Sequence, residues 1–156
     1  MQMTELRHTI KEQNKIASEW LIYYRQRRKE YEEKRQEIYS KKEKPIRLNA
    51  GLGKPTESLA INLVEYDCFS NTAKWLETVE HVEKMLGCKK RLLLKLRQES
   101  SFYAPSHGGR PGWTAQVQVK FGEVANCCPA EQVLRNMWNE TINLAVRLAF
   151  MKKCKF

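Results

Sequence analysis

The side chains best suited to recognition chemistry lie on a helix predicted to run from Pro129 to about Phe150. Hydrophobic residues at helical spacing, among them Leu134, Trp138 and Ile142, mark its buried side. The opposite side carries amide and charged groups: Glu131, Gln132, Arg135, Asn136, Asn139, Asn143 and Arg147. Arginine can donate to both acceptors of guanine, and Asn or Gln can pair with the donor and acceptor of adenine. These are the residue types of a DNA-reading helix, and they are also those of an ordinary solvated helix face.

A short helix predicted over 113–122 precedes this one, with a turn over 123–128 between them. Residues 113–150 therefore have the outline of a helix-turn-helix, in which the first turns of the second helix meet base edges. The residues expected to read bases are Gln132, Arg135, Asn136 and Asn139.

The net charge favours a polyanionic partner. The chain has 156 residues, with 28 basic and 18 acidic side chains and a formal charge of +10. Such a surface attracts phosphates and releases condensed counterions on binding. Residues 110–156 hold seven basic and three acidic side chains, and residues 1–44 hold twelve and eight. The residues expected to contact phosphates or the minor groove are Lys89, Lys90, Arg91, Arg110, Lys120 and Arg147.

Catalytic chemistry has little support in the sequence. Asp67 is the only aspartate, and no nucleophile elbow, zinc-binding His-Glu motif or acidic cluster is present. Metal-dependent nucleases gather several carboxylates around their ions. Residues 48–55 depart from the phosphate-binding P-loop, because Leu48 takes the place of its first glycine and Pro55 that of its Ser or Thr. We therefore expect no enzymatic role and no cofactor.

Cysteine usage and hydropathy indicate the cellular setting. The five cysteines form no C-x-x-C pair, and the three histidines keep no metal-ligand spacing to them. We predict reduced thiols and no metal site. No apolar run approaches the ~20 residues that cross a bilayer, and the N-terminus is too charged for a signal peptide. We expect a cytoplasmic protein without membrane contact.

The remaining segments are also expected to be helical. Residues 4–42 lack Gly and Pro and predict one long helix with hydrophobic residues seven apart, as in a coiled coil. A second line of residues beside it is apolar only as far as Trp20 and basic beyond it. The helix could therefore form a homodimer or pack on the C-terminal domain, and the sequence does not decide between the two. Further helices are predicted from Thr56, from Ser70 to a left-handed cap at Gly87, and over 88–100.

These elements predict an all-α fold in three parts. Residues 1–44 form the long basic helix with heptad spacing, and residues 45–55, which hold two prolines and two glycines, form a linker. Residues 56–156 form a helical DNA-binding domain that ends in the helix-turn-helix.

The segments KKRLLLKLR (89–97) and PAEQVLRNMWNETINLAVRLA (129–149) resemble the fourth region of bacterial sigma factors. The chain is more similar to the sigma-like phage regulators of the RinA and ArpU type, whose pattern matches Lys54–Glu57 and Leu96–Arg97, and to YqaQ-type prophage proteins. The chain differs from these regulators at two positions. Gln98 stands where they often have tyrosine, and Cys128 stands where a Ser or Thr is expected to cap the reading helix. The resemblance implies activation of late phage genes at promoters, with RNA polymerase as a further partner.

The leading hypothesis from the sequence is thus a sequence-specific, double-stranded-DNA-binding transcription regulator of phage or prophage genes. A small-terminase-like DNA-packaging protein is one alternative, because it also joins a helix-turn-helix to an oligomerising helix. A coiled-coil protein-interaction module that uses the N-terminal helix is the other.

Overall fold

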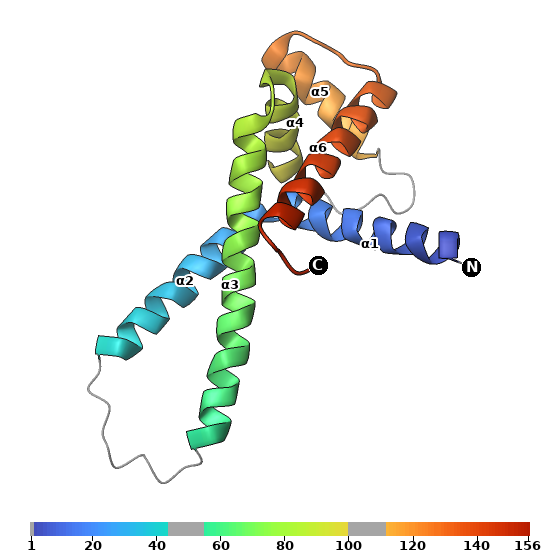
Figure 1. Ribbon diagram of the computed structural model, residues 1–156. Helices are drawn as coiled ribbons and strands as arrows, with labels where there is room; N and C mark the ends of the chain where they lie inside the picture. Colours follow the sequence, from blue (N-terminus) through green and yellow to red (C-terminus); the bar gives the residue numbers. More distant parts are fainter. Residues whose placement is uncertain (1, 44–54, 100–111) are drawn as a thin grey trace.

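The fold is all-α, as predicted. The computed structural model describes residues 2–43, 55–99 and 112–156, and no strand occurs in those ranges. The helices are α1 (Gln2–Ile22), α2 (Tyr24–Glu43), α3 (Pro55–Met85), α4 (Cys88–Glu99), α5 (Trp113–Ala125) and α6 (Glu131–Met151). The long α3 forms the axis of the molecule, and α6 packs beside its C-terminal half, with α4 and α5 at the same end (Figure 1). None of the helices in these ranges is long and apolar enough to cross a membrane.

The N-terminal helix is bent, so the prediction of one continuous helix over 4–42 is wrong at Tyr23. Backbone hydrogen bonds continue through the bend: the Tyr23 N–H donates to the Glu19 carbonyl (2.9 Å) and the Arg27 N–H to the Tyr23 carbonyl (3.0 Å). No Gly or Pro causes the change of direction. We attribute it to packing, because α1 contacts α3, α4 and α6 whereas α2 follows α3 away from the body (Figure 1).

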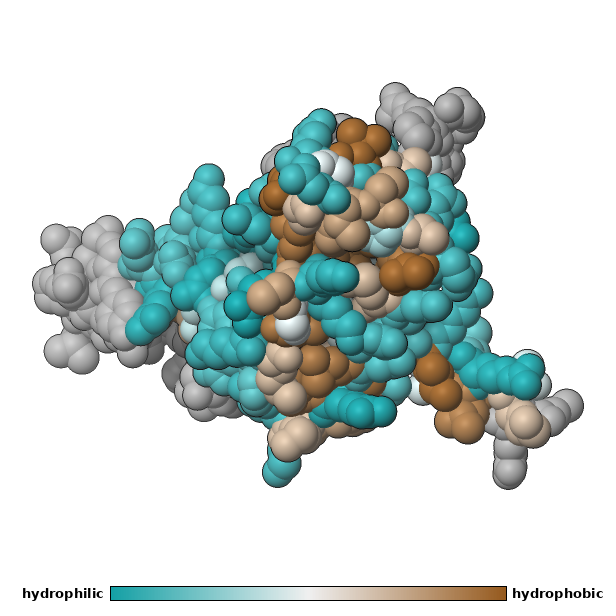
Figure 2. Space-filling view, turned by 90° about the horizontal axis from the view of Figure 1, so that it is seen from above, coloured by the Kyte–Doolittle hydropathy of each residue, from teal (hydrophilic) through white to brown (hydrophobic). Residues whose placement is uncertain are grey.

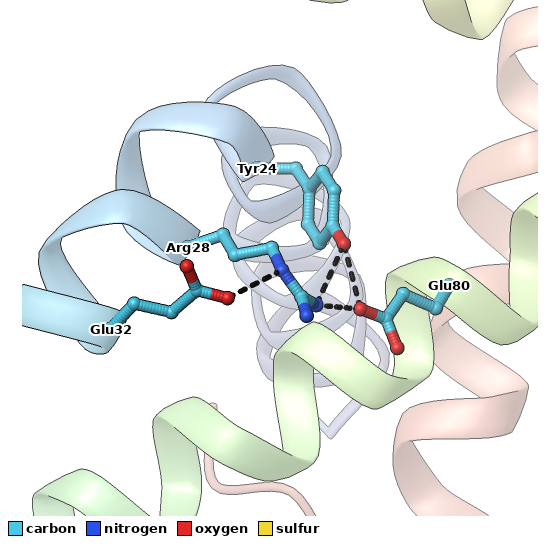
Figure 3. Close-up of polar contacts among 4 residues, drawn as sticks. All are labelled: Tyr24, Arg28, Glu32 and Glu80. Carbon is cyan, nitrogen blue, oxygen red and sulfur yellow. Dashed lines mark hydrogen bonds and ion pairs between the residues drawn. The ribbon is translucent and has the colours of Figure 1, made fainter. Parts of the chain in front are cut away.

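A polar cluster fixes the start of α2 against α3 (Figure 3). The Tyr24 hydroxyl donates to Glu80 Oε1 over 2.7 Å, and Arg28 forms an ion pair with the same carboxylate. Arg28 also donates to the Tyr24 hydroxyl (3.1 Å), and its Nε lies 3.3 Å from Glu32 Oε1. Burial raises the pKa of Tyr24, so its hydroxyl stays protonated and remains a donor. These bonds set the direction in which α2 leaves the bend.

The second half of α1 belongs to the main core. Ala17 and Leu21 are fully buried in the same hydrophobic cluster as residues of α3, α4 and α6. The first half projects beyond the body, and hydrophobic atoms are visible on that arm at the right of Figure 2. Its exposed hydrophobic residues are Met3, Leu6 and Ile10. The helix therefore folds back on the C-terminal part over half its length and leaves the other half uncovered.

The C-terminal residues pack on α3 around Trp75 and are hydrogen-bonded to it. The Trp75 ring stacks on Trp20 of α1 (centroids 5.5 Å apart, planes 2° apart) and meets Phe156 edge-on at 5.2 Å. Its indole N–H donates to the Lys155 carbonyl over 2.9 Å. Asn71 also binds this segment, since its Oδ1 accepts the Lys155 N–H at 2.7 Å. One buried indole thus joins α1, α3 and the last residues of the chain.

Two predictions about α3 are wrong. α3 is a single helix of 31 residues, so Ser70 lies inside it rather than at a helix start. Gly87 does not adopt the left-handed conformation predicted for it. The Arg91 side chain closes the end of α3 instead, donating from Nε and Nη2 to the carbonyls of Glu83 (3.1 Å), Lys84 (3.4 Å) and Leu86 (3.2 Å). A guanidinium that satisfies terminal carbonyls makes a left-handed cap unnecessary.

The predicted linker at 45–55 lies outside the described residues, except that its last residue, Pro55, begins α3. Pro55 suits that place because the first helical position needs no backbone N–H.

Candidate nucleic-acid interface

α5 and α6 are joined by a short, well-defined turn. α5 runs past the predicted end at Gly122 to Ala125, and Asn126 then adopts a left-handed conformation (φ 51°) that turns the chain. Gln118 of α5 donates to the Pro129 carbonyl over 2.9 Å and holds the turn. α6 begins at Glu131, with Ala130 at the N-cap position and no side-chain hydrogen bond there, so the predicted start at Pro129 is early.

The inner side of α6 is anchored by the core. Its buried hydrophobic residues are Leu134, Trp138, Ile142, Ala145, Leu148 and Ala149. Burial of several large apolar side chains, each worth roughly 1.5–3 kcal/mol, fixes the rotation of a helix about its axis. α6 contacts α1, α3, α4 and α5, so this rotation is set from several directions.

The four predicted base-reading residues are all exposed on the first half of α6. Gln132 Nε2 donates to Asn136 Oδ1 over 3.0 Å, which aligns the two amides along the helix. Arg135 Nη2 lies 4.0 Å from Glu131 Oε2, at the outer limit of an ion pair. Among the described residues Asn139 has no hydrogen-bond partner. The structure thus brings these amides and one guanidinium together on a single open face.

Two of the predicted phosphate-contacting residues are engaged within the fold. Lys90 of α4 forms an ion pair with Glu140 of α6 and so joins these two helices. Arg91 is bound to the carbonyls at the end of α3. Both side chains therefore have structural partners that the sequence did not reveal.

The other phosphate candidates differ in their surroundings. Lys89 and Arg147 are exposed and have no ion-pair partner in the described part of the chain. Lys120 is half-buried on α5. Arg110, and the hinge around it, lie outside the described residues. Lys89 and Arg147 are thus the candidates most accessible to phosphate.

Arg91→Ala is expected to lower the free energy of unfolding by about 1 kcal/mol, because the negative end of α3 loses its guanidinium donor. Lys89→Ala is the matched control. It removes the same charge from an exposed side chain two residues earlier and should change stability by less than about 0.5 kcal/mol. Urea unfolding followed by circular dichroism measures both, and equal midpoints for the two variants would show that the Arg91 contacts contribute nothing.

A cation that the sequence places only in the resemblance to phage regulators, and not among the site residues, lies between two tryptophans. The Arg97 guanidinium is 4.2 Å from the Trp113 ring centroid and 4.9 Å from that of Trp138. Burial lowers the pKa of Arg97 to about 10, against a smaller opposing effect of Tyr23, so it stays charged at neutral pH. The contacts join α4 to the start of α5 and to α6. The only sequence feature that indicates this contact is the position of Arg97 directly after the leucines of α4.

The described residues offer no alternative metal chemistry. All five cysteines are free. Cys154 is buried with its Sγ 3.4 Å from the Thr78 hydroxyl, and burial raises the pKa of this thiol. In the described ranges no three His, Cys, Asp or Glu side chains gather closely enough to hold a metal ion.

No protein-family model matches the chain, and comparison with curated proteins and with solved structures finds no significant match. The resemblance to sigma-like phage regulators therefore stays a hypothesis that depends on the segments 89–97 and 129–149.

Proposed function

We propose that the protein binds duplex DNA sequence-specifically, as a non-catalytic regulator of phage or prophage genes. The supporting observation is the open face of α6, opposite the buried Leu134 and Trp138. That face carries Gln132, Arg135, Asn136 and Asn139. Residues 132–139 span about 10 Å of helix axis, enough to follow about three base pairs in a major groove.

In this proposal, phosphate contacts position the helix and the α6 face reads the sequence. Lys89 and Arg147, both exposed, make the phosphate contacts. α5, the turn and α6 act together as a helix-turn-helix, and the Gln118–Pro129 hydrogen bond keeps the turn tight. RNA polymerase is a further proposed partner, which depends on the resemblance alone.

Selection of bound duplexes from a random pool, repeated at two salt concentrations, tests this function. We expect one enriched motif at both concentrations and an affinity that falls as salt rises. Recovery of unrelated sequences at both concentrations would contradict sequence-specific reading and leave only electrostatic attraction.

The exposed arm of α1 is the proposed dimer contact. Met3, Leu6 and Ile10 lie on the face of α1 that is buried further along the helix at Ala17 and Leu21, so the projecting half offers a second copy three exposed apolar side chains. Leu6→Glu is expected to raise the dimer dissociation constant about tenfold or more, because a charge would be placed in an apolar contact.

Sedimentation equilibrium measures this constant, and Thr4→Glu, at an exposed position of the same helix, is the control of equal charge. A parent protein that stays monomeric over the accessible concentrations would contradict the dimer. A closed ring of many subunits would contradict it too, and would favour the DNA-packaging alternative.

A further inference from the structure

α2 and α3 diverge as α2 leaves the body of the molecule (Figure 1). A groove lies between them, lined by residues of α1, α2 and α3. We call it the fork groove; its volume is about 270 Å³. The lining residues that carry the argument are Trp20, Arg27, Glu30, Tyr31, Lys34 and Phe69. They combine aromatic rings with cationic groups.

The aromatic part of the lining is held rigidly. Tyr31 of α2 and Phe69 of α3 stack with ring centroids 4.4 Å apart and planes 18° apart. Trp20 is fixed from behind by its parallel stack with Trp75. Tyr31 and Phe69 offer preformed planar surface, and a planar ligand gains affinity from such surface at little cost in side-chain ordering. The Trp20 ring, with Trp75 behind it and Arg27 above it, instead supports the Arg27 guanidinium.

Arg27 is the best-placed cation in the groove. Its guanidinium lies 4.2 Å above the Trp20 ring, and such a stack leaves the N–H groups at the edge of the guanidinium plane free to donate. In the described part of the chain no carboxylate or carbonyl accepts from them, whereas the neighbouring Arg28 is engaged by Glu80. Lys34, on the rim, likewise has no ion-pair partner among the described residues.

Among the lining residues that the structure describes, one carboxylate opposes this positive charge. Glu30 also lines the groove, where its Oε1 accepts a hydrogen bond from Gln26 (3.1 Å). The two cations outnumber it, so the local charge still favours an anion. Glu30 is useful as a probe, because its removal changes the affinity for an anion and for a cation in opposite directions.

The size and chemistry of the groove restrict what it can bind. Its volume is just below the roughly 300–1,000 Å³ of sites for drug-sized ligands. A single nucleobase with its phosphate has the planar surface and the negative charge that the lining complements. Aromatic rings in a cationic groove are how proteins hold unpaired bases, whereas a duplex keeps its base faces stacked inside.

We propose that the fork groove binds single-stranded nucleic acid, with one base against the Tyr31 and Phe69 rings and its phosphate on Arg27, which the Trp20 ring supports. This activity goes beyond the proposed reading of duplex DNA and involves none of the residues of the α6 face.

Fluorescence anisotropy of a labelled oligothymidylate, titrated with the full chain, tests the proposal. Arg27→Gln is expected to weaken binding about tenfold or more. Arg25→Gln, the matched control, removes the same charge from an exposed position outside the groove and should weaken binding less than about threefold. Glu30→Gln should tighten it.

Equal losses in Arg27→Gln and Arg25→Gln would overturn the proposal, since they would indicate only general electrostatic attraction. Competition by polyglutamate as effective as that by unlabelled oligothymidylate would overturn it in favour of an acidic peptide. If Arg27→Gln disturbs the fold, as judged by circular dichroism, Lys34→Gln on the exposed rim takes its place. This variant should also weaken oligothymidylate binding.

A duplex titration separates this proposal from the first one. Arg135→Ala should leave oligothymidylate binding unchanged, and Arg27→Gln should leave sequence preference on duplexes unchanged. A loss of oligothymidylate binding in Arg135→Ala equal to that in Arg27→Gln would overturn the fork groove as the separate site.

Discussion

Replacement of Trp75 by alanine should lower the free energy of unfolding by about 3–5 kcal/mol, as expected for loss of a large buried aromatic side chain. The ring is fully buried and stacks between α1 and the C-terminal residues. Truncation would also leave the Lys155 carbonyl without its indole donor. Since domains of this size are stable by only about 5–15 kcal/mol, a large share of the total would be lost. Urea unfolding followed by circular dichroism measures the change.

Trp75→Phe is the control that separates packing from hydrogen bonding. It keeps much of the aromatic volume and loses the N–H, so it should cost clearly less than alanine does. A loss below about 1 kcal/mol for Trp75→Ala would contradict the packing of α1 and the C-terminal residues described here.

The local elements could be predicted from the sequence wherever one helix face is strongly apolar. α4 and α6 follow from the spacing of buried residues such as Leu93, Leu134 and Trp138, which repeat at helical intervals. The exposure of Arg135 and Asn136 follows from the same pattern, because residues opposite a buried stripe face the solvent. Periodicity is local information, and these features depend on nothing more distant.

Features that depend on distant partners could not be predicted. The bend at Tyr23 has no Gly or Pro, and the contact that orients α2 after it joins Tyr24 to Glu80, 56 residues away. Lys90 and Arg91 belong to the same basic run as Lys89, yet the fold gives one an ion pair and the other a capping role. Charge was visible in the sequence, but the partner that decides its use was not.

The fork groove shows the same limit for a binding site. Trp20 and Phe69 lie on different helices, and no motif links them in the sequence. The hydrophobic residues seven apart in the N-terminal helix, which include Tyr24 and Tyr31, predict only a coiled-coil seam. The stack of Tyr31 on Phe69 appears only when α2 is placed along α3, whereas that of Arg27 on Trp20 joins residues seven apart across the bend.

Arg135→Ala should weaken binding to the selected duplex by about 1–3 kcal/mol and relax the preference at one base position. The reason is the fork-like guanidinium, which alanine cannot replace as a paired donor to guanine. The Arg135 side chain is exposed, so the fold should be unaffected by its loss. Anisotropy titrations with the selected duplex and with a scrambled duplex, at one salt concentration, give the two affinities whose ratio is the specificity.

Arg147→Ala is the matched control, because it removes the same charge from an exposed position further along α6. If Arg147 contacts a phosphate, Arg147→Ala should weaken binding to both duplexes alike and reduce the slope of affinity against salt concentration by about one. The specificity ratio should therefore fall for Arg135→Ala and stay constant for Arg147→Ala. If Arg135→Ala bound both duplexes as the parent does, the open face of α6 would not be the reading surface. If the two variants lost affinity in the same way on both duplexes, Arg135 would act only as a charge.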